Sequence, residues 1–370
     1  MSDVKPKFAV LGAGHGGMAM AGHLSLKGFD VKLYNRSEER LWGIKTMGGI
    51  TLEGELEGFA EIKTASTNIA DVIKDVDIIM VVVPATAHEF IAAQCAPHLK
   101  DGQIVILNPG RTMGALEFKQ VITRNSCSAD VIVAEAQTFI YASRVVNPAQ
   151  SHVFRIKNSI PVASVRAYLI PHVLEKLRIA YPQFVPGDNI FKTSFENIGA
   201  VFHPAICVLN AGWIEDDAEF QFYHEGVTES VARVLEKVDD ERVKVAAALG
   251  IRAISAREWL FLAYGAYGNN LREAMRANPG YRGIMAPNRL SIRYLSEDVP
   301  CSLVPMASIG EKFGVETPAI NSIIEMASVI NNTDYRAIGR TVERLGIENM
   351  SLRDLRLLAI GEKTEKDRSI

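Results

Sequence analysis

The chain has 370 residues, of which 48% are hydrophobic and 22% are charged, and its formal net charge is −3. This length is too great for one compact core and predicts about two domains. The near balance of charge argues against a general affinity for nucleic acid or for an anionic membrane surface. Any attraction for an anionic substrate must therefore come from local arginines.

The cysteines are far apart and form no CxxC pair; they are Cys95, Cys127, Cys207 and Cys301. This spacing argues against a metal cluster and against a disulfide framework, so we expect buried thiols, a reducing compartment and no metal. The longest apolar stretch, Val76–Pro84, contains Asp77 and is too short to cross a bilayer. The opening residues do not resemble a signal peptide, and the expected location is the cytoplasm.

Strands alternate with helices along the first half of the chain. The predicted strands are apolar runs typical of a sheet buried on both faces, at 7–12, 31–34, 77–83, 103–107 and 130–134. Helices are predicted at 18–27, which ends at Gly28, and at 87–99. Such alternation implies a parallel sheet with right-handed crossovers. We therefore expect a doubly wound Rossmann domain at residues 1–188.

The pattern changes at Tyr181–Asp188, a stretch with two prolines and a glycine. Beyond it, apolar residues recur at helical spacing, as in Val227–Leu249, which Gly250 follows. We expect an all-helical second domain at 189–370, so that the chain is α/β plus all-α, with the active site in the cleft between the domains. The apolar helix expected at Thr317–Ile330 favours a homodimer.

A glycine-rich turn follows the first predicted strand. Gly12, Gly14 and Gly17 satisfy the GxGxxG pattern, with His15 and Gly16 between them, and the turn opens a helix within a βαβ unit. Glycine permits the tight turn and the close approach of a pyrophosphate, and the helix N-terminus supplies N–H donors. The pattern predicts a nicotinamide dinucleotide site; the alternative is a turn without a ligand. His15 is either a phosphate contact or an ordinary loop residue.

The second predicted strand ends at Asn35-Arg36, about where a residue that contacts the adenosine ribose is expected. An NAD-specific site favours Asp or Glu there, whereas Arg36 could pair with a 2′-phosphate. We therefore expect NADP to be favoured over NAD. The alternative for Arg36 is a solvated surface side chain. Pro84, which follows the strand at 77–83, is the last predicted cofactor contact.

His203 is the best candidate for proton transfer in the second half of the chain. The next residue, Pro204, suits the first turn of a helix. This predicts that His203 lies at a helix N-terminus, where the helix dipole lowers the pKa of an imidazole. A paired carboxylate raises that pKa again. Such a balance suits general acid–base catalysis. The alternative is a structural histidine.

Two segments of the second half resemble the opine dehydrogenase family, with octopine and nopaline dehydrogenases as more distant members. They are Thr193–Ile198, followed by Phe202-His203-Pro204, and Arg293–Pro300. The resemblance covers nearly the whole chain. Other matching segments are Val83–Ala85, Leu107–Gly110, Gly114–Phe118, Glu225-Gly226, Glu236–Asp239, Asn278–Ile284 and Gly339–Thr341.

The resemblance implies an NAD(P)-dependent reductive N-alkylation. An α-keto acid such as pyruvate condenses with the amino group of an L-amino acid, and the imine takes a hydride to give an N-(carboxyalkyl)amino acid. By position in the motifs, His203 would exchange the proton, Asp298 would orient its ring, and Arg293 would bind a substrate carboxylate through two parallel hydrogen bonds. The alternatives are a helix-start residue for Asp298 and an interdomain ion pair for Arg293.

Two positions depart from the family pattern. Asn35-Arg36 replaces an acidic residue, so the cofactor preference of the relatives does not carry over. Gly199 replaces a second asparagine before His203, which leaves Asn197 either to bind the substrate or to cap a turn. Substrate identity therefore does not carry over either.

Two other functions fit the predicted architecture. Ketopantoate reductases, glycerol-3-phosphate dehydrogenases and 6-phosphogluconate-like dehydrogenases also join a Rossmann domain to a helical domain, but they generally use a lysine for proton transfer. No comparably placed lysine occurs in the motifs. A non-catalytic NAD(P) sensor needs no His–Asp pair, so substitution of His203 would abolish turnover in an enzyme and leave a sensor unaffected.

Overall fold

The computed structural model describes residues 5–216 and 218–361, and its chain divides into two compact units. The first unit holds the described residues up to Gly110, then Gly114–Thr193 and the segment from Arg353 onward. The second unit holds Arg111–Met113 and Ser194–Leu352. The predicted ranges 1–188 and 189–370 differ from these units mainly in the C-terminal segment. As functional domains, they stay a prediction.

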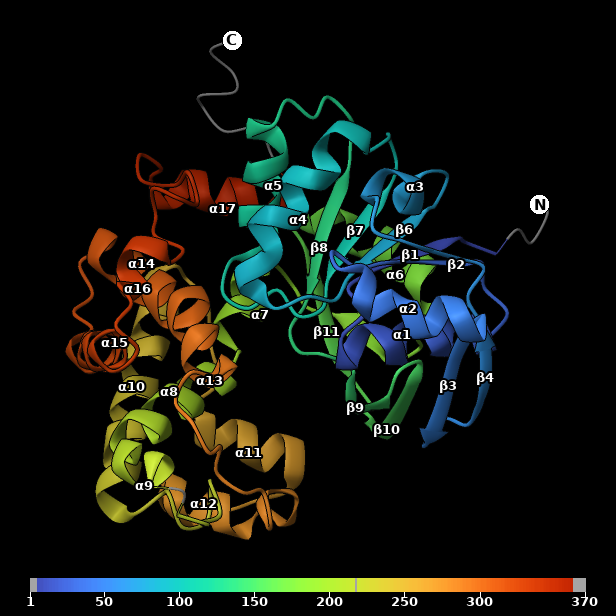
Figure 1. Cartoon of the computed structure of the whole chain (residues 1–370). Helices are drawn as coiled ribbons and strands as arrows, with labels where there is room; N and C mark the ends of the chain where they lie inside the picture. Colours follow the sequence, from blue (N-terminus) through green and yellow to red (C-terminus); the bar gives the residue numbers. More distant parts are fainter. Residues whose placement is uncertain (1–4, 217, 362–370) are drawn as a thin grey trace. The chain divides into compact units, whose positions relative to one another are not determined.

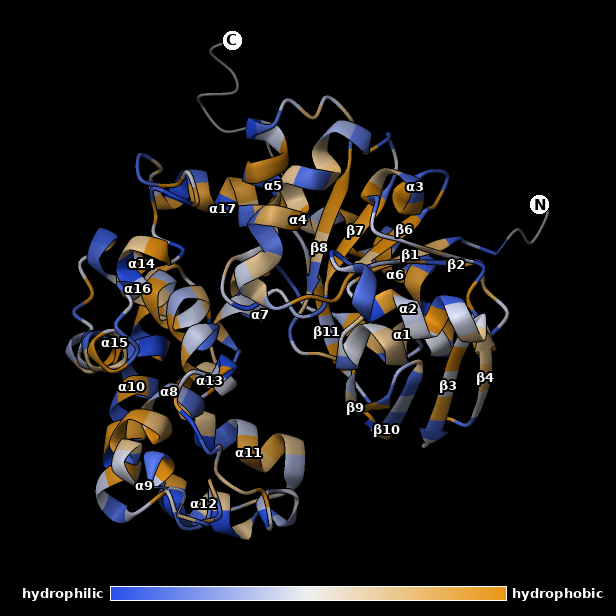
Figure 2. Ribbon diagram, viewed as in Figure 1, coloured by the Kyte–Doolittle hydropathy of each residue, from blue (hydrophilic) through white to orange (hydrophobic). Residues whose placement is uncertain are grey.

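The first unit contains an eight-stranded sheet with the order β12-β11-β8-β7-β6-β1-β2-β5 (Figure 1). Neighbouring strands are parallel except for β11 and β8. The central strands are fully buried, which explains their continuous apolar sequence, and Figure 2 shows β7 and β8 as hydrophobic. The strands are β1 (Phe8–Leu11), β2 (Val31–Tyr34), β5 (Thr64–Ser66), β6 (Ile78–Val81), β7 (Ile104–Leu107), β8 (Ile132–Ala136), β11 (Ile160–Ser164) and β12 (Phe184–Pro186).

Helices connect the parallel strands and pack on the sheet. α1 contacts β1 and β2, α3 contacts β2 and β5, α5 contacts β7 and β8, and α6 contacts β11 and β12. The predicted Rossmann arrangement is confirmed. The helices with residues in this unit are α1 (His15–Leu26), α2 (Glu38–Met47), α3 (Ile69–Ile73), α4 (His88–Cys95), α5 (Gly114–Arg124), α6 (Ile170–Arg178), α7 (Ile190–Phe195) and α17 (Leu352–Ile360).

A second, four-stranded sheet also packs on α1 and was not predicted. Its order is β4 (Gly58–Glu61), β3 (Gly49–Gly54), β10 (Gln150–Ile156) and β9 (Tyr141–Asn147). His23 of α1 has its Nδ1 2.8 Å from the hydroxyl of Tyr141 in β9, and this hydroxyl donates to the Tyr181 hydroxyl at 3.0 Å. These buried polar contacts tie α1 to the second sheet.

The second unit is helical, as predicted, and its described residues include an isolated β-bridge between Gln221 and Met285. α8 packs against α10, α13 and α15 and is buried on nearly every side, which explains its all-round apolar sequence. The helices are α8 (Gly199–Leu209), α9 (Ala211–Glu215), α10 (Glu229–Ala248), α11 (Ala256–Tyr264), α12 (Leu271–Ala277), α13 (Arg293–Ser296), α14 (Val304–Lys312), α15 (Pro318–Ile330) and α16 (Tyr335–Ile338).

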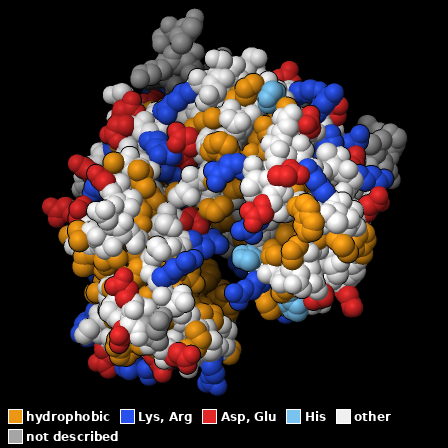
Figure 3. Space-filling model, viewed as in Figure 1, with side chains coloured by type: hydrophobic (Ala, Val, Ile, Leu, Met, Phe, Trp, Pro, Cys, Tyr) orange, Lys and Arg blue, Asp and Glu red, His pale blue; other side chains and the backbone are white. Residues whose placement is uncertain are grey.

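The apolar helix expected at 317–330 is α15. Its residues Ile320, Ile323 and Ile324 are buried inside the unit, whereas Val329 is 82% exposed. Burial within the chain thus accounts for most of the apolar character that suggested a homodimer, and the dimer stays a prediction. Acidic and basic side chains are interspersed over the visible face (Figure 3). Within the described ranges, no helix is both long enough and apolar enough to cross a membrane.

Candidate functional site

The glycine-rich turn joins β1 to α1 at the carboxyl end of the central strands. Gly12 has a φ of 119°, and a Cβ atom there would lie 2.3 Å from the carbonyl oxygen of Val82. A Cβ on Gly17 would lie 1.7 Å from the carbonyl oxygen of Gly12. These two glycines therefore let the first turn of α1 rest directly on the strand ends.

The space beside Gly14 is open, because a Cβ there would meet no atom within 4 Å. Gly14 caps α1 without a side-chain hydrogen bond, and the first turn of α1 holds no acidic residue. A helix start of this kind fits the pyrophosphate of a dinucleotide. Gly16 lies against the ring of Phe139, and His15 Nδ1 accepts a hydrogen bond of 2.8 Å from the amide of Val145.

Asn35 and Arg36 follow β2 beside the turn. Asn35 Oδ1 accepts from the amide of Ala13 at 3.1 Å, so this side chain braces the glycine-rich turn. The exposed Arg36 guanidinium lies 5.9 Å from the centre of the Phe90 ring. Pro84 precedes a short 3₁₀ turn at Ala85–Ala87, after β6. The structure thus places all of the predicted cofactor residues in the first unit.

The position of His203 in its helix differs from the prediction. α8 begins at Gly199, so His203 and Pro204 lie in its second turn, and the expectation of a helix start at His203 is wrong. The helix begins before His203 because the amides of Ala200 and Val201 already donate to the carbonyls of Asn197 and Ile198, respectively. Pro204 lies inside the helix, where it cannot donate to the preceding turn.

The imidazole of His203 is held by three neighbours. Its Nδ1 lies 2.8 Å from Asp298 Oδ2, and its Nε2 lies 3.1 Å from the Tyr223 hydroxyl. Its ring stacks on Tyr294, with the centroids 4.2 Å apart and the planes at 17°. Because an ionised Asp298 can only accept hydrogen bonds, we assign the proton of the neutral ring to Nδ1, and Nε2 then accepts from the Tyr223 hydroxyl.

Sequence reasoning missed Arg111, which is buried behind Asp298. Its Nη1 forms a close ion pair with Asp298 Oδ1 at 2.8 Å, although without the alignment of a full hydrogen bond. Its Nε donates to Glu297 Oε1 at 3.2 Å. The signal in the sequence is slight: Arg111 is the one charged residue of the stretch 104–116.

The segment Arg111–Met113 groups with the second unit because hydrogen bonds fix it there. The amide of Met113 donates to Ser194 Oγ at 2.9 Å, and the amide of Thr112 donates to the carbonyl of Cys301 at 3.2 Å. The carbonyl of Thr112 accepts from Nη1 of the buried Arg340 at 3.0 Å. Arg111 is therefore held on both sides by the helical unit.

The charges around Asp298 decide its ionisation. Burial alone would raise the pKa of the Asp298 carboxyl, but Arg111 and then His203 outweigh burial, and the net pKa lies below its ordinary value. Burial would lower the pKa of Arg111, but Asp298 and Glu297 raise it above its usual range. Both groups are therefore ionised at neutral pH.

Two other predicted residues lie at the edges of this cluster. Arg293 Nε pairs with Glu297 Oε2 at 3.1 Å, and its side chain is 63% exposed. Asn197 is buried; its Nδ2 donates to Ser302 Oγ at 3.1 Å, and its Oδ1 accepts from Arg111 Nη1 at 3.5 Å. The structure thus brings all four predicted catalytic and substrate residues into the second unit.

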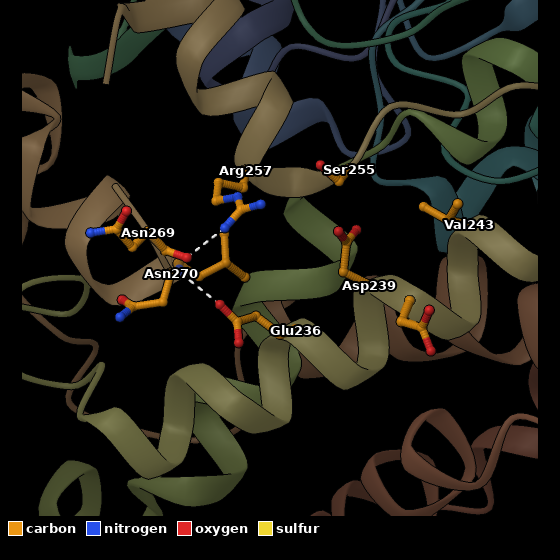
Figure 4. A pocket seen from close by; sticks show the side chains of 9 residues that line it. Glu236, Asp239, Val243, Ser255, Arg257, Asn269 and Asn270 are labelled. Atoms are coloured by element: carbon orange, nitrogen blue, oxygen red, sulfur yellow. Dashed lines mark hydrogen bonds between the residues drawn. The ribbon is translucent and has the colours of Figure 1, made fainter. Parts of the chain in front are cut away.

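A pocket of about 350 Å³ lies along α10 and is lined by none of the predicted site residues (Figure 4). Polar side chains that line it form hydrogen bonds and ion pairs within the protein. Glu236 accepts from the amide of Leu271 at 2.8 Å, and Asp239 pairs with the buried Arg242 at 2.6 Å. The described residues contain no group of three His, Cys, Asp or Glu residues that could hold a metal.

Comparison with known proteins agrees with this arrangement. Residues 186–331 match the family described as NAD/NADP octopine/nopaline dehydrogenase, alpha-helical domain. Residues 7–126 match the NAD binding domain of 6-phosphogluconate dehydrogenase. An opine dehydrogenase from Arthrobacter sp. (strain 1C) is 38% identical, over 94% of this chain and 97% of its own length.

Solved structures share the fold. Octopine dehydrogenase with NADH and L-arginine superposes with a TM-score of 0.82 at 20% identity, covering 98% of this chain and 99% of its own. Yersinopine dehydrogenase with NADP⁺ has a TM-score of 0.72 at 17% identity, with 99% of each chain covered. The Rossmann unit, the helical unit and the extent of these matches lead to one conclusion: this chain belongs to the opine dehydrogenase family of NAD(P)-dependent oxidoreductases.

Proposed function

We propose that this enzyme joins an α-keto acid to the amino group of an L-amino acid and reduces the resulting imine, with His203 as the acid–base group. The observation that carries the proposal is the fixed imidazole of His203 with a buried, ionised Asp298 at Nδ1. A carboxylate at this nitrogen orients the ring and stabilises the imidazolium after proton uptake. Pyruvate is the proposed keto acid.

Each step assigns a task to a residue of the chain. His203 removes one proton from the ammonium group of the amino acid. The free amine attacks the keto carbon and passes a second proton to the keto oxygen, and His203 returns its proton when the carbinolamine loses water. Arg293, which is 63% exposed and carries a planar guanidinium, binds a substrate carboxylate. Asn197, which hydrogen-bonds Arg111 and Ser302, is the other residue that we assign to the substrate. The dinucleotide supplies the hydride when it is bound.

The test is NADPH and NADH oxidation with pyruvate and a panel of L-amino acids, with mass detection of the product. We expect oxidation that depends on the amine and yields an N-(1-carboxyethyl)amino acid. His203→Asn should lower kcat by about 10²- to 10⁴-fold and leave cofactor binding unchanged. Equal oxidation without any amine would identify a simple keto-acid reductase. A fully active His203→Asn variant would overturn the role of the imidazole.

We propose further that NADP is the preferred cofactor. Asn35 is committed to the amide of Ala13, and no carboxylate stands at this position to repel a 2′-phosphate. Arg36 is exposed beside it and able to pair with that phosphate. Loss of one such charge-assisted bond costs about 1.5–3 kcal/mol.

Titration of cofactor binding tests this preference. Arg36→Gln should weaken NADPH binding by roughly 10- to 100-fold and leave NADH binding unchanged. Arg40→Gln, which removes another exposed arginine from α2, is the matched control and should change neither affinity. Equal weakening of both cofactors by Arg36→Gln would contradict the assignment.

A further inference from the structure

The Nε2 atom of His203 is the nitrogen from which a substrate would receive a proton, and in this structure it faces the hydroxyl of Tyr223 at 3.1 Å. Because Nδ1 is committed to Asp298, the catalytic proton of His203 enters and leaves at Nε2. Tyr223 therefore stands directly on the path of that proton. The family motifs that identified His203 and Asp298 do not include Tyr223.

The ring of Tyr223 is fixed by aromatic neighbours. It is 6% exposed and stacks on Tyr281, with the ring centres 4.0 Å apart and the planes at 15°. Phe222 packs edge-on against it at 5.1 Å. The backbone is also held, since the amide of Phe222 donates to the carbonyl of Ile284 at 2.8 Å. The hydroxyl is thus positioned by the folded unit, as a catalytic group requires.

Tyr223 keeps its proton at neutral pH. Burial, and then the neighbouring Tyr281, Tyr294 and Asp298, raise its pKa well above the ordinary value for a phenol. A neutral phenol both donates and accepts a hydrogen bond. It can therefore release its own proton on one side while it accepts another proton from an imidazolium on the other side.

We propose that Tyr223 relays the proton of His203 to the hydroxyl group that leaves as water when the carbinolamine collapses to the imine. This inference rests on the proposed function. His203 first takes one proton from the ammonium group of the amino acid. The free amine then attacks the keto carbon, and a second nitrogen proton passes to the former keto oxygen, which completes the hydroxyl of the carbinolamine. In the next step the C–O bond breaks, the nitrogen lone pair forms the C=N bond, and the departing hydroxyl takes the proton of Tyr223. Tyr223 takes the proton held at Nε2, so both side chains return to their starting states.

The relay makes a prediction that separates dehydration from hydride transfer. A preformed cyclic imine, 1-pyrroline-2-carboxylate, already contains the C=N bond and has no hydroxyl to lose. Its reduction needs the hydride but no proton from Tyr223. A residue that merely supported the fold would affect both substrates alike.

The experiment compares Tyr223→Phe with Tyr281→Phe, each as the full chain with NADPH. Phenylalanine keeps the stacked ring and removes only the hydroxyl, and the Tyr281 variant is the matched control. With pyruvate and an amino acid, Tyr223→Phe should lose about 10²-fold in kcat, as for a lost acid–base group. Its rate with the cyclic imine and its cofactor affinity should change by no more than about twofold, a free-energy change under 0.5 kcal/mol. Tyr281→Phe should keep both rates.

A proton inventory gives a readout that does not depend on the cyclic imine. Two protons move together in the relay, so the rate of the wild-type reaction should bow downward as the deuterium fraction rises, and the plot should become straight in Tyr223→Phe. Full activity of Tyr223→Phe with pyruvate and amine would overturn the relay alone, and equal losses on both substrates would assign Tyr223 to support. Wild-type enzyme without amine-dependent turnover would instead overturn the proposed function.

Discussion

Replacing Arg111 by Met should destabilise the protein through the carboxylates that it leaves behind. Arg111 is buried and pairs with Asp298 at 2.8 Å and with Glu297 at 3.2 Å. Glu297 keeps a second partner, Arg293, at 3.1 Å, so the loss falls mainly on Asp298. Removal of one partner from a buried ion pair costs about 3–5 kcal/mol. This is a large share of a typical stability of about 5–15 kcal/mol.

The assay is urea unfolding at neutral pH, followed by tryptophan fluorescence from Trp213 and Trp259 in the second unit. Arg293→Met is the matched control, because it breaks an i,i+4 pair whose arginine is 63% exposed, and such pairs contribute about 0–1 kcal/mol. The double variant Arg111→Met/Asp298→Asn should recover much of the lost stability, since the isolated charge is then absent. If Arg111→Met lowers the free energy of unfolding no more than Arg293→Met does, Arg111 does not stabilise the buried charge of Asp298.

The pH dependence of the same variant gives an independent check. The pKa of Asp298 in the folded protein lies below its unfolded value, so the ionised carboxylate stabilises the fold above the unfolded pKa. That contribution is lost as the pH falls through the folded pKa. Without Arg111 the folded pKa of Asp298 rises, so protonation of Asp298 no longer costs stability in the variant. The stability difference between the wild type and Arg111→Met should therefore be greatest at neutral pH and should shrink as the pH falls, and a difference that grows in acid would contradict this reasoning.

Three further changes test other parts of the structure. A Cβ at Gly199 would lie 3.0 Å from His203 Cε1, so Gly199→Ala should displace the ring and lower kcat about tenfold at unchanged cofactor affinity; an unchanged kcat would show that the ring has room to move. Gly17→Ala places a Cβ 1.7 Å from the Gly12 carbonyl oxygen and should abolish dinucleotide binding in a fluorescence titration, whereas retained affinity would contradict the close packing of α1. Burial, and then Lys27, lower the pKa of His23 from 6.5 to about 4, so the unfolded state takes up a proton first as the pH falls. The wild type should therefore lose about 3 kcal/mol between pH 6.5 and 4, and His23→Gln should show a flatter urea midpoint across that window.

Local patterns were sufficient for the central sheet and the dinucleotide turn. The central strands, such as β1 and β6, are short apolar runs in the sequence. The glycines at 12, 14 and 17 follow β1 within a few residues, so the turn can be recognised from one short segment. The second sheet depends instead on parallel pairing of β3 with β10, two segments far apart in the chain. Its strands are half-exposed, so they lack the continuous apolar signal.

The cluster around His203 shows the same division. The sequence context of Phe202-His203-Pro204 pointed to His203, the resemblance to a family added Asp298, and the structure places the two side chains 2.8 Å apart. Their roles in the reaction stay a prediction. The helix start was misplaced because proline was assumed to open α8, whereas the apolar residues before it already form the first turn. Arg111 has only a slight local signal and Tyr223 has none, since each contacts Asp298 or His203 only after the chain has folded.

The membership of Arg111–Met113 in the helical unit limits how this protein can be taken apart or recombined. A fragment cut at the sequence boundary would leave Asp298 behind without the arginine that neutralises it. A chimaera that borrows the nucleotide-binding half of a relative would import whatever residue that relative carries at this position. The helical half therefore cannot be exchanged alone. A successful exchange has to transfer Arg111–Met113 together with it, although these residues lie in the N-terminal half of the sequence.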